Sequence, residues 1–89
     1  MNIKKFASAG TVESSDAFIE VSPADEGVTV EVESIVKKQF GAAIEACARE
    51  VADSLGVTAC EIRINDRGAL DCVIRARVET AIKRAGGNE

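Results

Sequence analysis

The sequence predicts an α+β fold: a two-layer sandwich of a small antiparallel sheet and two helices, in the order β-β-α-β-α. Three segments alternate apolar and polar residues, as a strand with one buried face does. Two longer segments repeat apolar residues every three or four positions, as a helix does, and turn-forming residues separate the segments. Because the chain has 89 residues and no internal repeat or linker, we expect a single domain over residues 1–89 with one modest core.

The strand patterns lie in residues 17–22, 28–33 and 57–64, and the helical patterns lie in residues 34–55 and 69–85. The strand residues expected to face the core are Ala17, Ile19, Val21, Val28, Val30, Val32, Cys60, Ile62 and Ile64. The helix residues expected on the buried stripes are Val36, Phe40, Ile44, Cys47, Val51, Leu55, Leu70, Val73, Ile74, Val78, Ala81, Ile82 and Ala85. Stacking the two helices on one face of the sheet would bury all of these residues.

The connection between the first two strands has the composition of a short hairpin loop, in which Gly27 can take a positive φ. Residues 17–33 are therefore predicted to form an antiparallel hairpin. Residues 1–16 form an arm that includes the loop of interest below, and residues 3–7 of this arm could add a fourth strand.

The composition argues against several functional classes. The 15 acidic residues outnumber the 11 basic ones, the net charge is −4, and the only aromatic residues are three phenylalanines. Such a chain is poorly suited to hold a phosphate backbone or to stack bases, so we expect no nucleic-acid partner. Because no apolar run could span a bilayer and the N-terminal residues lack the apolar centre of a signal peptide, we expect a cytoplasmic protein without a membrane partner.

Cysteine and histidine usage bears on catalysis and metal binding. Cys47, Cys60 and Cys72 lack the close paired spacing of a zinc site or a redox dithiol. All three lie on predicted apolar faces, so we interpret them as buried free thiols. The chain has no histidine, which is the commonest general base and metal ligand. We therefore expect no metal site, no catalytic residue and no enzymatic activity of the isolated chain.

Residues 9–16, with the sequence Ala-Gly-Thr-Val-Glu-Ser-Ser-Asp, hold two adjacent hydroxyls between two acids. This segment could be an ordinary acidic turn whose side chains bond nearby amides. It could also present a serine as an attachment point, because a hydroxyl among small residues on a loop is accessible to a modifying enzyme. The carboxylates of Glu13 and Asp16 would repel an incoming phosphate, which argues against self-modification. We expect the modified residue to be Ser14, with Ser15 as its nearest alternative.

A second serine lies in the tripeptide Asp53-Ser54-Leu55. This tripeptide looks like the phosphopantetheine attachment site of ordinary acyl carrier proteins, in which the serine opens a helix and the helix N-terminus helps to hold the phosphate. Here Ser54 falls at the predicted end of a helix, where the helix dipole disfavours a phosphate. We interpret the tripeptide as a coincidence.

Residues 65–79 combine a turn with the start of the second helix. Asp66 or Asp71 could accept hydrogen bonds from backbone N–H groups there, and Asp71 and Arg75 are spaced to form an ion pair across one helical turn. These structural roles explain most of the segment. Its arginines could also engage a phosphate or a carboxylate of a partner through their forked donors. They are Arg67, Arg75 and Arg77.

Three segments together resemble one protein family. They are residues 9–16, the sequence Val-Lys-Lys-Gln-Phe-Gly at 36–41, and the sequence Asp-Arg-Gly-Ala-Leu-Asp-Cys-Val-Ile-Arg-Ala-Arg-Val-Glu at 66–79. In this order and at these positions they are similar to the citrate lyase acyl carrier protein, the gamma subunit of that enzyme, and the resemblance covers nearly the whole chain. The family's modified serine follows Gly-Thr-x-Glu, which corresponds to Ser14 here.

The resemblance implies a covalent carrier rather than a catalyst. It implies that Ser14 holds a 2'-(5-phosphoribosyl)-3'-dephospho-coenzyme A group through a phosphodiester, with a prosthetic-group transferase and an acetylating ligase as further partners. It also implies that the citrate lyase alpha subunit exchanges the acetyl thioester to citryl, and that the beta subunit cleaves the citryl thioester to oxaloacetate and the acetyl thioester. The net reaction splits citrate into acetate and oxaloacetate, as in citrate fermentation.

Two alternatives to this function stay open at the level of sequence. The carrier subunit of malonate decarboxylase resembles this family and bears the same type of group. A noncatalytic protein-interaction domain, which would bind a partner through its sheet or its arginine-bearing helix, is the alternative from a different class. The partner subunits would distinguish the first alternative, and the modification state of Ser14 would distinguish the second.

Overall fold

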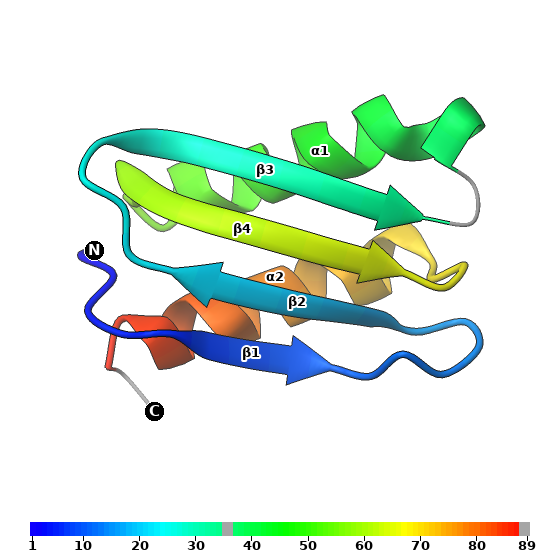
Figure 1. Cartoon of the computed structure of the whole chain (residues 1–89), viewed down its shortest axis with the longest axis horizontal. Coiled ribbons are helices and arrows are strands. Elements are labelled where there is room, and N and C mark those ends of the chain that lie inside the picture. Colours follow the sequence, from blue (N-terminus) through cyan, green and yellow to red (C-terminus); the bar gives the residue numbers. More distant parts are fainter. Residues whose placement is uncertain (35–36, 88–89) are drawn as a thin grey trace.

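The computed structural model describes residues 1–34 and 37–87. It confirms the α+β class and adds one strand from the N-terminal arm, so the order is β-β-β-α-β-α (Figure 1). The elements are β1 Ala7–Gly10, β2 Ala17–Ser22, β3 Gly27–Ser34, α1 Lys37–Ser54, β4 Ala59–Asp66 and α2 Asp71–Ala85. The arm therefore contributes its strand at Ala7–Gly10, slightly later than the predicted residues 3–7.

The prediction of an antiparallel hairpin over residues 17–33 is wrong. The strand order in the sheet is β1-β2-β4-β3, so β4 lies between the two strands of the predicted hairpin. β2 pairs antiparallel with both β1 and β4, whereas β3 and β4 pair in parallel, so the sheet is mixed rather than purely antiparallel. The reason is α1, which returns the chain along the sheet and lets β4 start beside the start of β3. The loop between β2 and β3 spans the width of β4 instead of making a tight turn.

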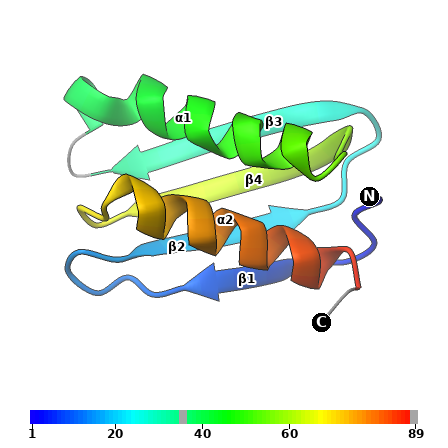
Figure 2. The same ribbon diagram turned by 180° about the vertical axis from the view of Figure 1, so that it is seen from behind.

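Both helices cover the same face of the sheet (Figure 2). α1 packs against β3, α2 packs against β1 and β2, and the two helices contact each other. The predicted inward faces of the strands are confirmed, because alternate residues point to the helices. The buried strand residues include Ala17, Ile19, Val21, Val32, Cys60, Ile62 and Ile64, while Val28 and Val30 are partly buried against the same core.

The helical stripes are confirmed in their middle and wrong near the helix starts. Phe40, one turn before the buried Ile44, is 52% exposed and lines a groove at the end of the sandwich. Leu70 is 71% exposed because it precedes α2 in an extended conformation, with φ −69° and ψ 155°, and so does not share the helical face. Cys72 is exposed because it lies two residues, about 200° around the helix, from the buried Ile74. Val36 falls outside the described residues.

The helix bounds also differ from prediction at their starts. α1 begins at Lys37 rather than at residue 34, because Ser34 still belongs to β3 and pairs with Asp66 of β4. α2 begins at Asp71 rather than at residue 69. Across the residues that the structure describes, neither helix is long and apolar enough to cross a membrane.

The central strand offers a direct test of this core. Ile62 on β4 has 0% exposure, so Ile62→Val should remove a buried methyl group and lower the free energy of unfolding by about 0.5–1.5 kcal/mol. Val12→Ala, at a side chain that is 56% exposed, should change it by less than about 0.5 kcal/mol. Urea unfolding curves with an unchanged slope would measure both values. Equal losses in the two variants would contradict the placement of β4 at the centre of the core.

Candidate functional site

Ser14 lies on the loop between β1 and β2, at the end of the sandwich that also carries the loop between β4 and α2 (Figure 1). The carbonyl of Glu13 accepts a hydrogen bond from the N–H of Asp16 at 3.1 Å, which closes a four-residue turn. Ser14 and Ser15 are its two central residues, and Ser15 has a positive φ of 66°. A positive φ at the second central position alone is the pattern of a type II turn. Ser14 therefore sits at the tip of the turn with its side chain exposed.

The backbone of this turn is bonded to the neighbouring loop. The N–H of Ser15 donates to the carbonyl of Arg67 at 2.8 Å, and the N–H of Arg67 donates to the carbonyl of Asp16 at 2.9 Å. These two bonds continue the pairing of β2 with β4 beyond the ends of the strands. The position of the Ser14 turn is thus set by main-chain bonds that do not involve the Ser14 side chain.

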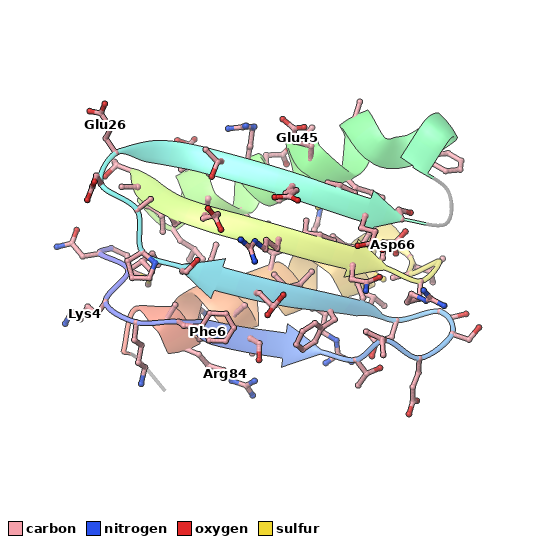
Figure 3. The ribbon with its side chains drawn as sticks, in the orientation of Figure 1. Lys4, Phe6, Glu26, Glu45, Asp66 and Arg84 are labelled. Carbon is pink, nitrogen blue, oxygen red and sulfur yellow. The ribbon has the colours of Figure 1, made fainter. Side chains whose placement is uncertain are left out.

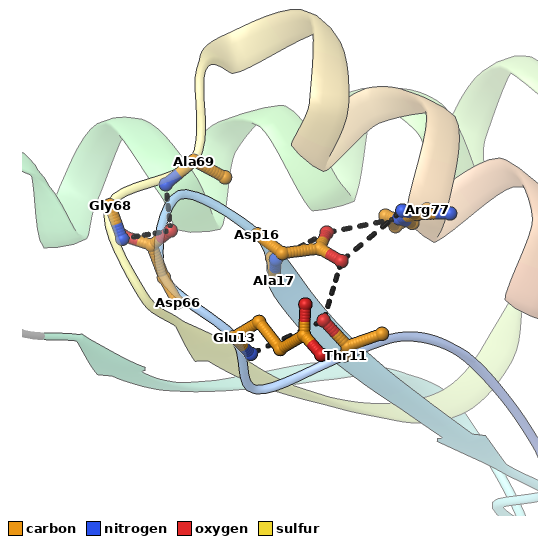
Figure 4. A network of polar contacts seen from close by, with 8 residues as sticks. All are labelled: Thr11, Glu13, Asp16, Ala17, Asp66, Gly68, Ala69 and Arg77. Carbon is orange, nitrogen blue, oxygen red and sulfur yellow. Dashed lines mark hydrogen bonds and ion pairs between the residues drawn. The ribbon is translucent and has the colours of Figure 1, made fainter.

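Asp16 is the polar centre of the site (Figure 4). Its carboxylate accepts hydrogen bonds from the Thr11 hydroxyl at 2.7 Å and from the N–H of Ala17 at 2.7 Å. Arg77 of α2 adds a two-pronged ion pair, with Nε 3.1 Å from Oδ1 and Nη2 3.2 Å from Oδ2. The bonds from Thr11, from Ala17 and from Arg77 together lower the pKa of Asp16 to about 2, because each favours the ionised carboxylate. The charge that flanks Ser14 is therefore held in place and balanced.

The sequence did not reveal this network. It suggested Asp16 only as an acidic neighbour of the serines and Arg77 only as one of three donors for a phosphate or a partner. The two residues are 61 positions apart, and no local pattern links them. The structure thus places Arg77 near Ser14, where its guanidinium binds the Asp16 carboxylate.

Gly10 explains why a glycine begins the Gly-Thr-x-Glu sequence. It has a φ of 93°, and a Cβ at this position would collide with the carbonyl oxygen of Ala17 and come within 3.2 Å of Cδ of Arg77. Only glycine permits this close approach of β1 to the start of β2 and to α2.

The second loop of the site is organised by Asp66, which is only 1% exposed. Its carboxylate accepts hydrogen bonds from the N–H groups of Gly68 at 3.2 Å and Ala69 at 2.9 Å, and from the Ser34 hydroxyl at 2.8 Å. Of the two aspartates predicted to bind backbone amides here, Asp66 does so (Figure 4), whereas Asp71 makes no side-chain cap bond to α2. Asp66 thereby fixes the loop on which Arg67 stands.

The remaining candidates lie elsewhere. The predicted ion pair between Asp71 and Arg75 is present at 3.1 Å, and Arg75 also reaches Glu50 of α1 at 3.0 Å, so it joins the two helices. Ser54 donates its hydroxyl hydrogen bond to the carbonyl of Val51 at 2.8 Å. It ends α1 at the opposite end of the molecule from Ser14, on the side of the N-terminus (Figure 1), and so takes no part in the site.

A groove that the sequence did not predict opens at the same end of the sandwich, between the first turns of the two helices. It has a volume of about 250 Å³. Its lining residues are Phe40, Ala43, Ile44, Asp66, Ala69, Asp71 and Ile74. No sequence signal indicated this groove, because Phe40, which is 52% exposed in its lining, was predicted to lie on the buried stripe.

Comparison with known proteins assigns the chain to a family. Residues 4–85 match the family model for the malonate decarboxylase delta subunit (MdcD), a family of acyl carriers. The chain is 54% identical over 86 residues to the citrate lyase acyl carrier protein of Escherichia fergusonii, covering 96% of this chain and 89% of that one. It is 53% identical over 85 residues to the citrate lyase acyl carrier protein of Haemophilus influenzae, with coverages of 96% and 88%. The chain belongs to the citrate lyase acyl carrier protein family. The resemblance seen in the sequence is thereby confirmed, and with it the role of an acyl carrier subunit.

Solved structures share the fold of this citrate lyase acyl carrier family member. A chain of the Pseudomonas malonate decarboxylase hetero-tetramer, determined in complex with malonate, superposes with a TM-score of 0.81 at 25% identity, over 94% of this chain and 87% of that one. A Thermus thermophilus protein superposes with a TM-score of 0.67 at 16% identity, over 94% of this chain but only 16% of its own, and so shows the fold alone.

Two glycine-to-alanine variants can separate the cost of a Cβ collision from the cost of a positive φ. Gly27 has a φ of 77° with open space where a Cβ would stand, so Gly27→Ala should cost only the left-handed conformation, about 1–2 kcal/mol. Gly10→Ala adds the collision with Ala17 and should lower the free energy of unfolding by clearly more, because β1 must move away from β2. Urea unfolding of both variants measures the difference. Equal costs would show that the approach at Gly10 is not close.

The low pKa of Asp16 predicts a pH dependence of stability. Its folded pKa of about 2 lies below the ordinary value of 3.8, so its stabilising contribution is complete above about pH 4 and is lost as the pH falls through about 2. Asp16→Asn should therefore be less stable than the wild type at neutral pH, and the gap should narrow between about pH 4 and about pH 2. Denaturant unfolding across this range measures the gap, with Asp25→Asn on an exposed loop as the control for loss of a surface charge. A gap that does not change with pH would contradict the network.

Proposed function

We propose that Ser14 carries a covalent 2'-(5-phosphoribosyl)-3'-dephospho-coenzyme A group and that the chain is the carrier subunit of citrate lyase. In this role it presents acetyl and citryl thioesters to the alpha and beta subunits, which cleave citrate to acetate and oxaloacetate. The observation that carries the proposal is the exposed hydroxyl of Ser14 at the tip of a turn whose backbone is bonded to Arg67 of the neighbouring loop through Ser15 and Asp16. The Gly10-Thr11-x-Glu13 sequence that precedes it supports the same residue.

The site fits a large group attached at this oxygen. Among the described residues the Ser14 hydroxyl has no hydrogen-bond partner, so a phosphodiester there displaces no contact. The neighbours that hold the turn use main-chain groups and the Asp16 carboxylate instead. When bound, the group supplies the thiol on which acyl groups are carried. The part of this chain is to fix one end of the arm while leaving the arm itself in solvent.

Ser15 is the competing hydroxyl, and its setting differs from that of Ser14. Both side chains are exposed, but Ser15 occupies the left-handed position of the turn and its N–H is bonded to Arg67. Ser15 is therefore bonded through its backbone to the neighbouring loop, whereas Ser14 has no such bond among the described residues. Together with the order of residues after Gly10, this supports Ser14 as the modified residue.

The small size of the domain fits a carrier that performs no catalysis of its own. A flexible arm keeps its thioester at a high effective concentration for two active sites in turn, so the domain needs an anchor and a means of docking rather than a catalytic cleft. The transferase that loads Ser14 and the ligase that acetylates the thiol would be further partners. A cytoplasmic location accords with these partners and with the three free cysteines.

Malonate decarboxylase provides the second candidate complex. The matching family model is described by its delta subunit, and the Pseudomonas hetero-tetramer contains a chain of the same fold. Sequence identity favours the citrate lyase complex, because it is 25% to that chain and 51–54% to citrate lyase carriers. Reconstitution with the alpha and beta subunits of citrate lyase tests this choice directly: citrate cleavage supports the first complex, and its absence with a fully loaded carrier supports the second.

The attachment residue can be identified by intact mass. Chain isolated from a citrate-fermenting host should carry one large adduct, and Ser14→Ala should lose it, because the phosphodiester needs the hydroxyl oxygen. Ser15→Ala and Ser54→Ala, which remove the two competing hydroxyls, should keep it. If the adduct survives in Ser14→Ala, the assignment is wrong. If Ser14→Ala restores full citrate cleavage to a complex, the chain is a noncatalytic interaction domain instead.

A further inference from the structure

Arg67 differs from the other two arginines of residues 65–79 in its ion pairing. Arg77 is committed to Asp16, and Arg75 is committed to Asp71 and Glu50. Arg67 is exposed and forms no ion pair with any residue in the described parts of the chain, 1–34 and 37–87. It is therefore the cation near the turn that is available to an external anion.

The backbone places Arg67 directly beside the turn. Its carbonyl accepts from the N–H of Ser15 and its own N–H donates to the carbonyl of Asp16, so the residue is bonded to both positions that follow Ser14. The loop behind it is fixed by Asp66, which binds the N–H groups of Gly68 and Ala69 (Figure 4). The backbone of Arg67 is thus held next to the Ser14 turn, and its side chain is exposed.

The carboxylates near Ser14 would repel a phosphate attached there, and a nearby cation would reduce this repulsion. Two carboxylates flank the serines, and both would repel a phosphate. The charge of Asp16 is balanced by Arg77 at 3.1–3.2 Å (Figure 4), at the end of the sheet where Figure 3 labels Asp66. Glu13 is exposed, and its carboxylate has no ion pair among the described residues, so it opposes an anion at Ser14. An uncommitted guanidinium on the adjacent loop offsets this repulsion.

We propose that the Arg67 guanidinium binds phosphate oxygens of the group attached at Ser14 and so holds the first segment of the arm against the loop between β4 and α2. This rests on the proposed attachment at Ser14 and goes beyond it. Its forked N–H donors can engage two oxygens of one phosphate, which a lysine ammonium cannot match in geometry. The contact fixes the anchored end of the arm and leaves the thiol end mobile.

Nuclear magnetic resonance of the modified and unmodified chain tests this contact. The Nε–H resonance of Arg67, assigned by its absence in Arg67→Gln, should move when Ser14 is modified. The phosphodiester ³¹P resonance should in turn differ between the wild type and Arg67→Gln. The difference should shrink at about 1 M salt, where charges on the surface are screened within about 3 Å. Amide resonances of Ser15 and Asp16 that stay in place in unmodified Arg67→Gln would show that the turn remains folded.

Arg63 provides the matched control, because it is an exposed arginine that pairs with Glu61 on the open face of the sheet. Its Nε–H resonance should not move on modification, and Arg63→Gln should leave the ³¹P resonance unchanged. The inference is overturned if Arg67 does not respond to modification, or if the ³¹P resonance is the same in Arg67→Gln and the wild type, although Ser14 is loaded. If intact mass shows that Ser14 is not loaded at all, the proposed attachment itself is wrong and the inference falls with it.

Discussion

The ion pair between Asp16 and Arg77 ties the two layers of the molecule together at the place where Ser14 is presented. Asp16 immediately precedes β2, and Arg77 lies in the middle of α2, so their contact joins the sheet layer to the helix layer. The Asp16 side chain is 16% exposed, so the ion pair is partly shielded from solvent. The Thr11 hydroxyl and the Ala17 N–H donate two further hydrogen bonds to the Asp16 carboxylate. The glycine at position 10 is a consequence, because the arginine side chain and the Ala17 carbonyl leave no room for a Cβ.

The mixed topology of the sheet brings the second half of the site to the same end. Because β3 and β4 are parallel and β2 is antiparallel to β4, the start of β2 lies beside the end of β4. The loops that flank these two strands can then continue the sheet's hydrogen bonds, as Ser15 and Arg67 do. A hairpin of β2 with β3 would have separated the two loops and left the Ser14 turn without its outer support.

Features that depend on local periodicity could be predicted from the sequence, whereas features that depend on contacts between distant segments of the chain could not. The buried faces of β2, β4 and the middle of α2 follow from apolar spacing, since one face of each element must meet the core. Apolar spacing does not identify the neighbouring strand, so it could not show that α1 returns the chain and that β4 lies between β2 and β3. The predicted burial of Phe40 and Leu70 is wrong because apolar spacing shows neither where the opposite layer ends nor that α2 begins only at Asp71. The pair of Asp16 with Arg77 joins residues 61 positions apart, beyond the reach of any local pattern.

The residues on either side of Ser14 are bonded into the fold, whereas the Ser14 hydroxyl is bonded to none of the described residues. Glu13 supplies a carbonyl, Ser15 a left-handed backbone and an N–H, and Asp16 a carboxylate, so each neighbour is bound into the fold. The Ser14 hydroxyl makes no hydrogen bond within the described residues. A group added to its oxygen can therefore take up many orientations without loosening the turn, while the turn keeps the point of attachment still. Under the proposed attachment at Ser14, this turn would give the arm a fixed anchor without restricting it, which suits a carrier whose thioester serves two active sites in turn.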